Sequence, residues 1–99
     1  MDAQIEIERN GMGITHSEFE RIFPRLVIDS EKIVLGPMTK VIWVGARSLT
    51  VHISKEKLRK IAMLRIPFVD IRFIFEGFVR HEVERFMARF DLAFHKGGG

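Results

Sequence analysis

Residues 68–77, FVDIRFIFEG, carry the most regular strand pattern in the chain. Successive side chains of a strand point to opposite faces, so a half-buried strand alternates in character with a period of two residues. Here one set of alternate positions is entirely large and apolar: Val69, Ile71, Phe73 and Phe75. Pro67 also restricts Ile66 to an extended backbone at the start of the stretch. The pattern therefore predicts a strand with one apolar face.

After Gly77 the period of the apolar residues changes to that of a helix. At ~100° per residue they fall within about 120° of a helical wheel. These residues are Val79, Val83, Phe86, Met87, Phe90, Ala93 and Phe94. A second pattern competes at the end of this region, because Phe90, Leu92 and Phe94 also alternate. The longer stripe favours a helix, and a terminal strand over residues 90–96 stays as the alternative.

The N-terminal residues predict a strand and a tight turn. Residues 3–8 alternate between apolar and polar side chains, with isoleucine and glutamate in succession, as in a half-buried strand. Asn10-Gly11 is typical of a type I′ turn. We expect a short return strand after it that includes Met12 and Ile14.

A helix is predicted next, with Thr15 or Ser17 as its N-cap. Its apolar residues have the helical spacing i, i+3, i+4, i+7: Phe19, Ile22, Phe23 and Leu26. Pro24 lies inside this pattern and has no backbone N–H to donate. We therefore expect the helix to kink there or to end near Phe23.

The middle of the chain predicts an antiparallel meander followed by another helix. Three short β-type runs, KIVL, KVIWV and LTVHI, lie within residues 32–53 and are separated by turn residues. The second run is apolar on both sides, so both of its faces need cover. Ser54 predicts the cap of a helix over residues 55–64, KEKLRKIAML, with Leu58, Ile61 and Ala62 on one face.

Together these elements predict an α+β fold. We expect a mostly antiparallel sheet of four to five strands with two or three helices packed on one face. The chain has 99 residues, which fits one domain, 1–96, followed by a flexible glycine tail, 97–99.

Composition and motifs argue against several classes of function. The chain has no cysteine, so disulfides, thiol catalysis and cysteine zinc sites are excluded. We find no catalytic or nucleotide-binding motif and predict neither enzymatic activity nor a metal or cofactor site. No signal peptide is apparent, and the longest apolar run, VIWVGA, is far shorter than the ~20 residues of a membrane helix. We expect a cytoplasmic protein that does not enter a membrane.

Positive charge is concentrated in the middle third of the chain. Residues 34–66 contain seven basic and one acidic side chain, whereas the whole chain has a net charge of only +3. Such a cluster attracts polyanions because binding releases counterions from phosphate. Nucleic-acid or other polyanion binding is therefore one functional hypothesis, and a solvated basic surface is the structural alternative. The candidate residues are Arg47, Lys55, Lys57, Arg59, Lys60 and Arg65.

Apolar side chains predicted to lie on uncovered surfaces suggest a protein partner. If helices cover one face of the sheet only, apolar residues on the other face need another surface to pack against. The candidate interface residues are Ile42, Val44, Phe68, Ile74 and Leu92. The leading hypothesis is a small interaction module that forms a homodimer or docks on another protein.

The three terminal glycines, Gly97–Gly99, give one further alternative. They are similar to the Gly-Gly end of ubiquitin-like modifiers and sulfur carriers, and that likeness implies a carrier activated at its C-terminal carboxylate. In that family a strand leads into the glycines, whereas the apolar stripe here favours a helix. A helix would make Gly97 a C-cap in the left-handed conformation.

Overall fold

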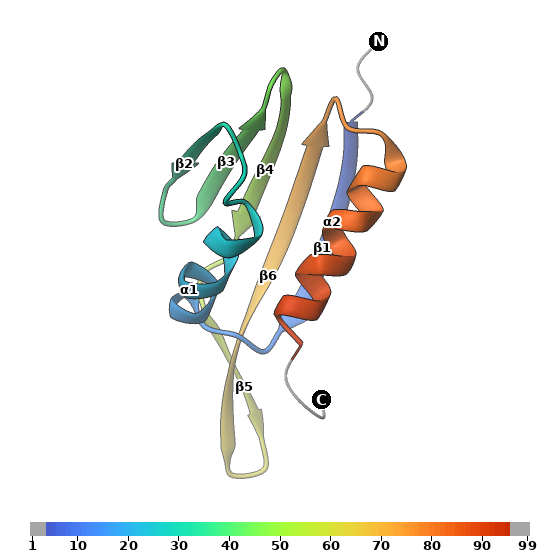
Figure 1. The fold of residues 1–99 in the computed structure, drawn as a ribbon. Coiled ribbons are helices and arrows are strands. Elements are labelled where there is room, and N and C mark those ends of the chain that lie inside the picture. Colours follow the sequence, from blue (N-terminus) through green and yellow to red (C-terminus); the bar gives the residue numbers. More distant parts are fainter. Residues whose placement is uncertain (1–3, 96–99) are drawn as a thin grey trace.

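Six strands and two helices make up residues 4–95, the part of the chain that the computed structural model describes. Figure 1 shows their arrangement. In chain order they are β1 (Gln4–Met12), α1 (His16–Leu26), β2 (Lys32–Leu35), β3 (Thr39–Val44), β4 (Arg47–Ile53), β5 (Lys57–Ile61), β6 (Leu64–Glu76) and α2 (Arg80–Ala93). The α+β class and the antiparallel sheet are confirmed; the sheet has six strands instead of four or five.

The long strand β6 organises the sheet. The order of the strands in the sheet is β1-β6-β4-β3-β2, and every pairing is antiparallel. Residues 71–76 of β6 lie between β1 and β4, Val69 pairs with β1, and residues 64–68 pair with β5 alone. The first half of β6 therefore extends past the body of the sheet, and the second half is its centre.

Both helices lie on the same face of the sheet (Figure 1). The apolar side of β6 points toward them, and Val69 and Phe73 are fully buried. Phe73 packs edge-on against Phe90 of α2, with ring centroids 4.8 Å apart. Phe19 of α1 stacks on Phe94 at 5.5 Å, which joins the two helices. Aromatic pairs of this kind contribute about 0.5–1.5 kcal/mol beyond their burial. The core is therefore a phenylalanine layer between sheet and helices.

Helix α1 begins with a complete capping box. The Thr15 hydroxyl accepts from Glu18 N, and the Glu18 carboxylate accepts from Thr15 N at 3.1 Å. The helix does not end at Phe23 as one of the predictions had it; it continues through Pro24 to Leu26. Pro24 lies in the last turn, where only one backbone hydrogen bond is lost and little helix remains to be bent.

The predicted hairpin at Asn10-Gly11 is wrong. Strand β1 continues through this segment to Met12 and stays paired with β6. A register shift between Arg9 and Met12 takes up the turn-forming residues as a bulge, with Gly11 in the left-handed region at φ +66°. The edge of β6 offers β1 a longer partner than a short return strand would.

The predicted helix over residues 55–64 is also wrong. Residues 57–61 form β5 and pair with residues 64–68 of β6. Ala62, at φ 55°, makes the tight turn between them. Leu58 and Ile61 fit a helical stripe, but Pro67 keeps the following segment extended, and this segment provides a strand for pairing.

At the other end of the chain, the helix predicted before the glycines is confirmed. Helix α2 extends to Ala93, and Phe94 N donates to Phe90 O at 3.0 Å. The alternative of a strand over residues 90–96 is therefore wrong for the residues that are described. The tail, 97–99, lies outside those residues.

Candidate functional site

A two-stranded hairpin projects from one end of the sheet. It consists of β5, the start of β6 and the residues that lead into β5, and we call residues 55–68 the arm. In Figure 1 the arm extends beyond the body at the end opposite to the β3–β4 turn. It contributes to an elongated molecule of 50 × 24 × 23 Å. At ~3.4 Å per residue the paired part of the arm is about 17 Å long.

The pairing register assigns the side chains of the arm to two faces. Residues directly opposite each other in an antiparallel pair lie on the same face. One face therefore carries three such pairs: Lys57 with Phe68, Arg59 with Ile66, and Ile61 with Leu64. The other face carries two: Leu58 with Pro67, and Lys60 with Arg65. Both faces of the arm consequently hold cationic side chains.

Charge separates the arm from the rest of the protein. The arm contains five basic and one acidic side chain, a net charge of +4. Removing these from the totals of 16 basic and 13 acidic residues leaves eleven and twelve, a net charge of −1 for everything else. Every residue from Lys55 to Ile66 is exposed. The positive charge of the chain is thus displayed on its most protruding element.

The structure brings together five of the six predicted basic residues. Lys57 pairs with Asp70, Nζ to Oδ2 at 2.8 Å, and the Arg59 guanidinium lies 4.8 Å from the centroid of the Phe68 ring. Within residues 4–95, the other three make no ion pair: Lys55, Lys60 and Arg65. Three cations are therefore available to an external anion, and a fourth, that of Arg59, lies over an aromatic ring.

Hydrogen bonds fix the root of the arm. Asp70 Oδ1 accepts from Gly11 N at 2.8 Å, and Asp70 N donates to Ser54 Oγ at 2.9 Å. His16 N donates to Glu56 Oε1 at 2.6 Å, which ties the only acidic residue of the arm to α1. The hydrogen bonds from Lys57 and from Gly11 lower the pKa of Asp70. The carboxylate thus stays charged where β1, β5 and β6 meet.

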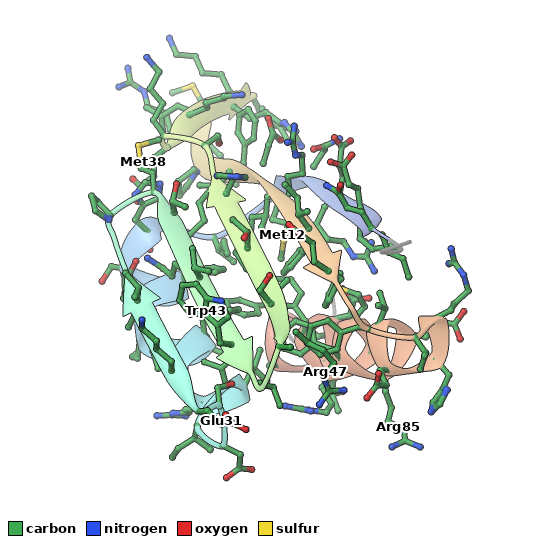
Figure 2. The ribbon with its side chains drawn as sticks, turned by 90° about the horizontal axis from the view of Figure 1, so that it is seen from above. Met12, Glu31, Met38, Trp43, Arg47 and Arg85 are labelled. Carbon is green, nitrogen blue, oxygen red and sulfur yellow. The ribbon has the colours of Figure 1, made fainter. Side chains whose placement is uncertain are left out.

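Arg47 does not belong to this cluster. It begins β4 at the end of the strand remote from the arm, and its Nη1 lies 2.7 Å from Glu82 Oε2. Its guanidinium also lies 5.0 Å from the Phe78 ring. Figure 2 shows Arg47 beside α2, whereas Arg85 extends from that helix away from the sheet. Arg47 therefore holds α2 against the sheet.

The tip of the arm is apolar, which the sequence analysis missed. Met63 is 96% exposed, Leu64 63% and Ile61 51%. A helical reading of residues 55–64 hid the feature, because it separates these residues around the helix. The available signal was two short runs, KLRKI and LRIPF, on either side of two residues. An uncovered apolar tip next to cations is a feature to be explained by binding.

The predicted interface residues do not form one surface. Ile42 is 2% exposed and packs in the core, and Val44 points to the same helix-covered face. Phe68 lies on the arm under Arg59, Ile74 is half-buried on the uncovered face, and Leu92 is 78% exposed on α2. An interface through Ile42 is thus excluded in the folded chain, since its side chain is already covered.

The alternation of side chains along β3 explains why Ile42 is buried. Lys40 and Ile42 point to the helices. Lys40 is 1% exposed, and its charge is compensated by Glu20 of α1, whose Oε1 lies 2.6 Å from Lys40 Nζ. Val41 and Trp43 accordingly lie on the uncovered face. The prediction that Ile42 and Val44 lie on the uncovered face is wrong, because Ile42 is buried.

Strand β2 is one of the two edge strands of the sheet, and β1 is the other. All four residues of β2 are exposed, and three of them are large and apolar, Ile33, Val34 and Leu35. Gly36 N donates to Thr39 O at 2.9 Å. Because inward and outward backbone groups alternate in an antiparallel strand, that bond directs the N–H and C=O groups of Ile33 and Leu35 to the free edge. Such an edge can accept another strand.

Residues 4–95 contain neither a group of side chains placed to hold a metal ion nor a helix that could cross a membrane. No group of three or more histidine, aspartate or glutamate side chains in this range is placed to hold a metal ion. His16 Nε2 lies 2.7 Å from Ser54 O, and His52 Nδ1 lies 3.2 Å from Thr39 Oγ1. Neither of the two helices in this range is long and apolar enough to cross a membrane.

Comparison with known proteins gives no relative. The sequence matches no protein-family model and no curated protein, and its fold matches no solved structure.

Proposed function

We propose that the protein binds double-stranded nucleic acid through its arm. The observation that carries the proposal is the net charge of +4 on a projecting two-stranded ribbon, attached to a body of net charge −1. Lysine and arginine gain affinity for a duplex by releasing counterions from its phosphates. A two-stranded ribbon is also one of the elements that fit into a groove of the duplex.

The distribution of cations on the arm favours a groove over a flat acidic surface. Arg59 extends from one face of the ribbon, and Lys60 and Arg65 from the other. A groove has a row of phosphates on each side, so both faces of an inserted ribbon meet negative charge. A flat partner would contact only one of them. The Phe68 ring beneath Arg59 orients that guanidinium at the root of the ribbon.

Titration with labelled duplexes tests this proposal. A 20-base-pair DNA and an RNA of the same sequence would be followed by fluorescence anisotropy at several salt concentrations. We expect log K to fall linearly with log salt, with a slope of about −3 to −4 for four phosphate contacts. The proposal is abandoned if neither duplex binds at low salt, or if binding does not depend on salt.

We propose self-association through β2 as a second function, because a specific feature favours it. Ile33 and Leu35 direct free backbone groups to the edge of the sheet, and their side chains are partly exposed. Natural edge strands usually carry lysine, proline or a bulge that blocks pairing. In β2 only the first residue, Lys32, is of this kind. Antiparallel pairing of two β2 strands would give a symmetric dimer with a continuous sheet.

A further inference from the structure

We infer that the tip of the arm inserts Met63 between base pairs from the minor groove and thereby bends the duplex. The inference rests on the proposed nucleic-acid function and names what the tip does in it. Ala62 and Met63 form the two-residue turn of the arm, at its point most distant from the sheet. The 96% exposure of Met63 shows that it contributes nothing to the core.

Turn geometry presents this side chain as a wedge. Ala62 adopts a left-handed backbone at φ 55°, which closes the hairpin with only two residues between Ile61 and Leu64. Ile61 and Leu64 are paired on one face of the arm, and the side chains of both are more than half exposed. The apolar surface is therefore narrow and limited to the end of the ribbon. Proteins that kink DNA from the minor groove insert such a side chain, methionine included, into a base step.

The cations behind the tip match this orientation. Lys60 and Arg65 form the next cross-strand pair, on the face opposite to Ile61 and Leu64, and Arg59 follows on the first face. When the tip enters the groove first, these cations lie along its two phosphate walls. Their attraction to phosphate offsets part of the cost of unstacking, which is a few kcal/mol per step. Methionine, unbranched and flexible, adapts to the opened step.

Sequence dependence follows from the mechanism. Pyrimidine–purine steps such as TA unstack most readily, whereas A-tracts are stiff. A duplex with a central TA step should therefore bind severalfold more tightly than one with an uninterrupted A-tract, although no side chain needs to read a base. The preference should depend on Met63 and should survive at a salt concentration where overall binding is weaker.

The bend can be measured by energy transfer between dyes at the two ends of a 30-base-pair duplex containing a central TA step. The wild-type protein should shorten the end-to-end distance. Met63→Ala should lose most of this change and the TA preference, but should keep the salt slope and affinity within about tenfold. Met38→Ala is the matched control, since Met38 is also an exposed methionine, 42% exposed, outside the arm. It should behave as wild type.

Three results would overturn the inference. Salt-dependent binding without bending would exclude the insertion of Met63 between base pairs but would leave the proposed function intact. Equal bending by wild type and Met63→Ala would show that another group deforms the duplex. If no duplex binds, but vesicles of phosphatidylcholine and phosphatidylserine bind wild type and not Met63→Ala, the tip is a membrane wedge and the nucleic-acid function fails with it. Circular dichroism of each variant establishes that the fold is unchanged.

Discussion

Lys57 and Asp70 form an ion pair at the root of the arm, with Nζ 2.8 Å from Oδ2. The same carboxylate accepts a hydrogen bond from Gly11 N in the bulge of β1. Asp70 thus connects β1, β5 and β6 at the point where the arm leaves the sheet.

Asp70→Asn should make the free energy of unfolding less dependent on pH in the acid range. The pKa of Asp70 is lowered in the fold, chiefly by the hydrogen bond from Lys57 and then by that from Gly11. A lowered pKa contributes stability above the unfolded value of about 3.9, and the contribution is lost as pH falls through the folded value. Urea midpoints measured between pH 7 and pH 2 should fall less in the variant than in wild type. Identical pH profiles would show that the pair contributes nothing.

The same substitution should increase affinity for a duplex. Replacing the carboxylate with an amide releases Lys57 from its partner and raises the net charge of this region by one. The slope of log K against log salt should become more negative by roughly 0.9, which corresponds to one additional phosphate contact. Glu82→Gln is the matched control, because Glu82 pairs with Arg47 at the remote end of β4. If both variants change the slope equally, the effect is one of overall charge.

Phe90→Ala should destabilise the protein strongly, whereas Leu92→Ala should not. Phe90 is fully buried between Phe73 and Phe94, and truncation of a buried phenylalanine costs about 3–5 kcal/mol. Leu92 is 78% exposed, so its truncation should stay within about 0.5 kcal/mol. Urea denaturation gives both free energies of unfolding. Comparable losses for the two variants would contradict a helix in this segment.

Leu35→Lys should dissociate the dimer proposed through β2. The added charge lies at the free edge, where lysine opposes strand addition. Light scattering coupled to size exclusion should give twice the chain mass for wild type at tens of micromolar and the mass of one chain for the variant. Leu92→Lys is the matched control, as an exposed leucine on α2. Loss of the dimer in that control alone would move the interface to α2, and a monomeric wild type would exclude self-association.

Strong local periodicity made the body of the fold predictable. The alternation in residues 68–77 and the stripe between Val79 and Phe94 each correspond to one element of the structure. In both cases the buried side of the element is apolar and the other side is polar or mixed, so the period identifies the element and its inner face together. Thr15 is likewise the N-cap of α1, one of the two predicted.

Where local signals conflicted, the sequence was insufficient. Leu58, Ile61 and Ala62 have helical spacing, and Ala62 is a poor indicator of the left-handed turn that it makes. Pairing with residues 64–68 decided the outcome, and the apolar tip became visible only with it. In β3 both faces are apolar, so periodicity could not assign Ile42 to the core. That assignment depends on Glu20, which lies on another element and compensates the charge of Lys40.

The central claim is that the arm binds duplex phosphates, and the salt slope tests it most directly. Lys60→Gln/Arg65→Gln removes two cations from the arm, and Arg21→Gln/Arg25→Gln removes two exposed ones from α1 with the same change in net charge. We expect the arm variant to reduce the slope of log K against log salt by about two and the helix variant to leave it unchanged. Equal slopes for the two variants, or a change in the helix variant alone, would contradict the claim.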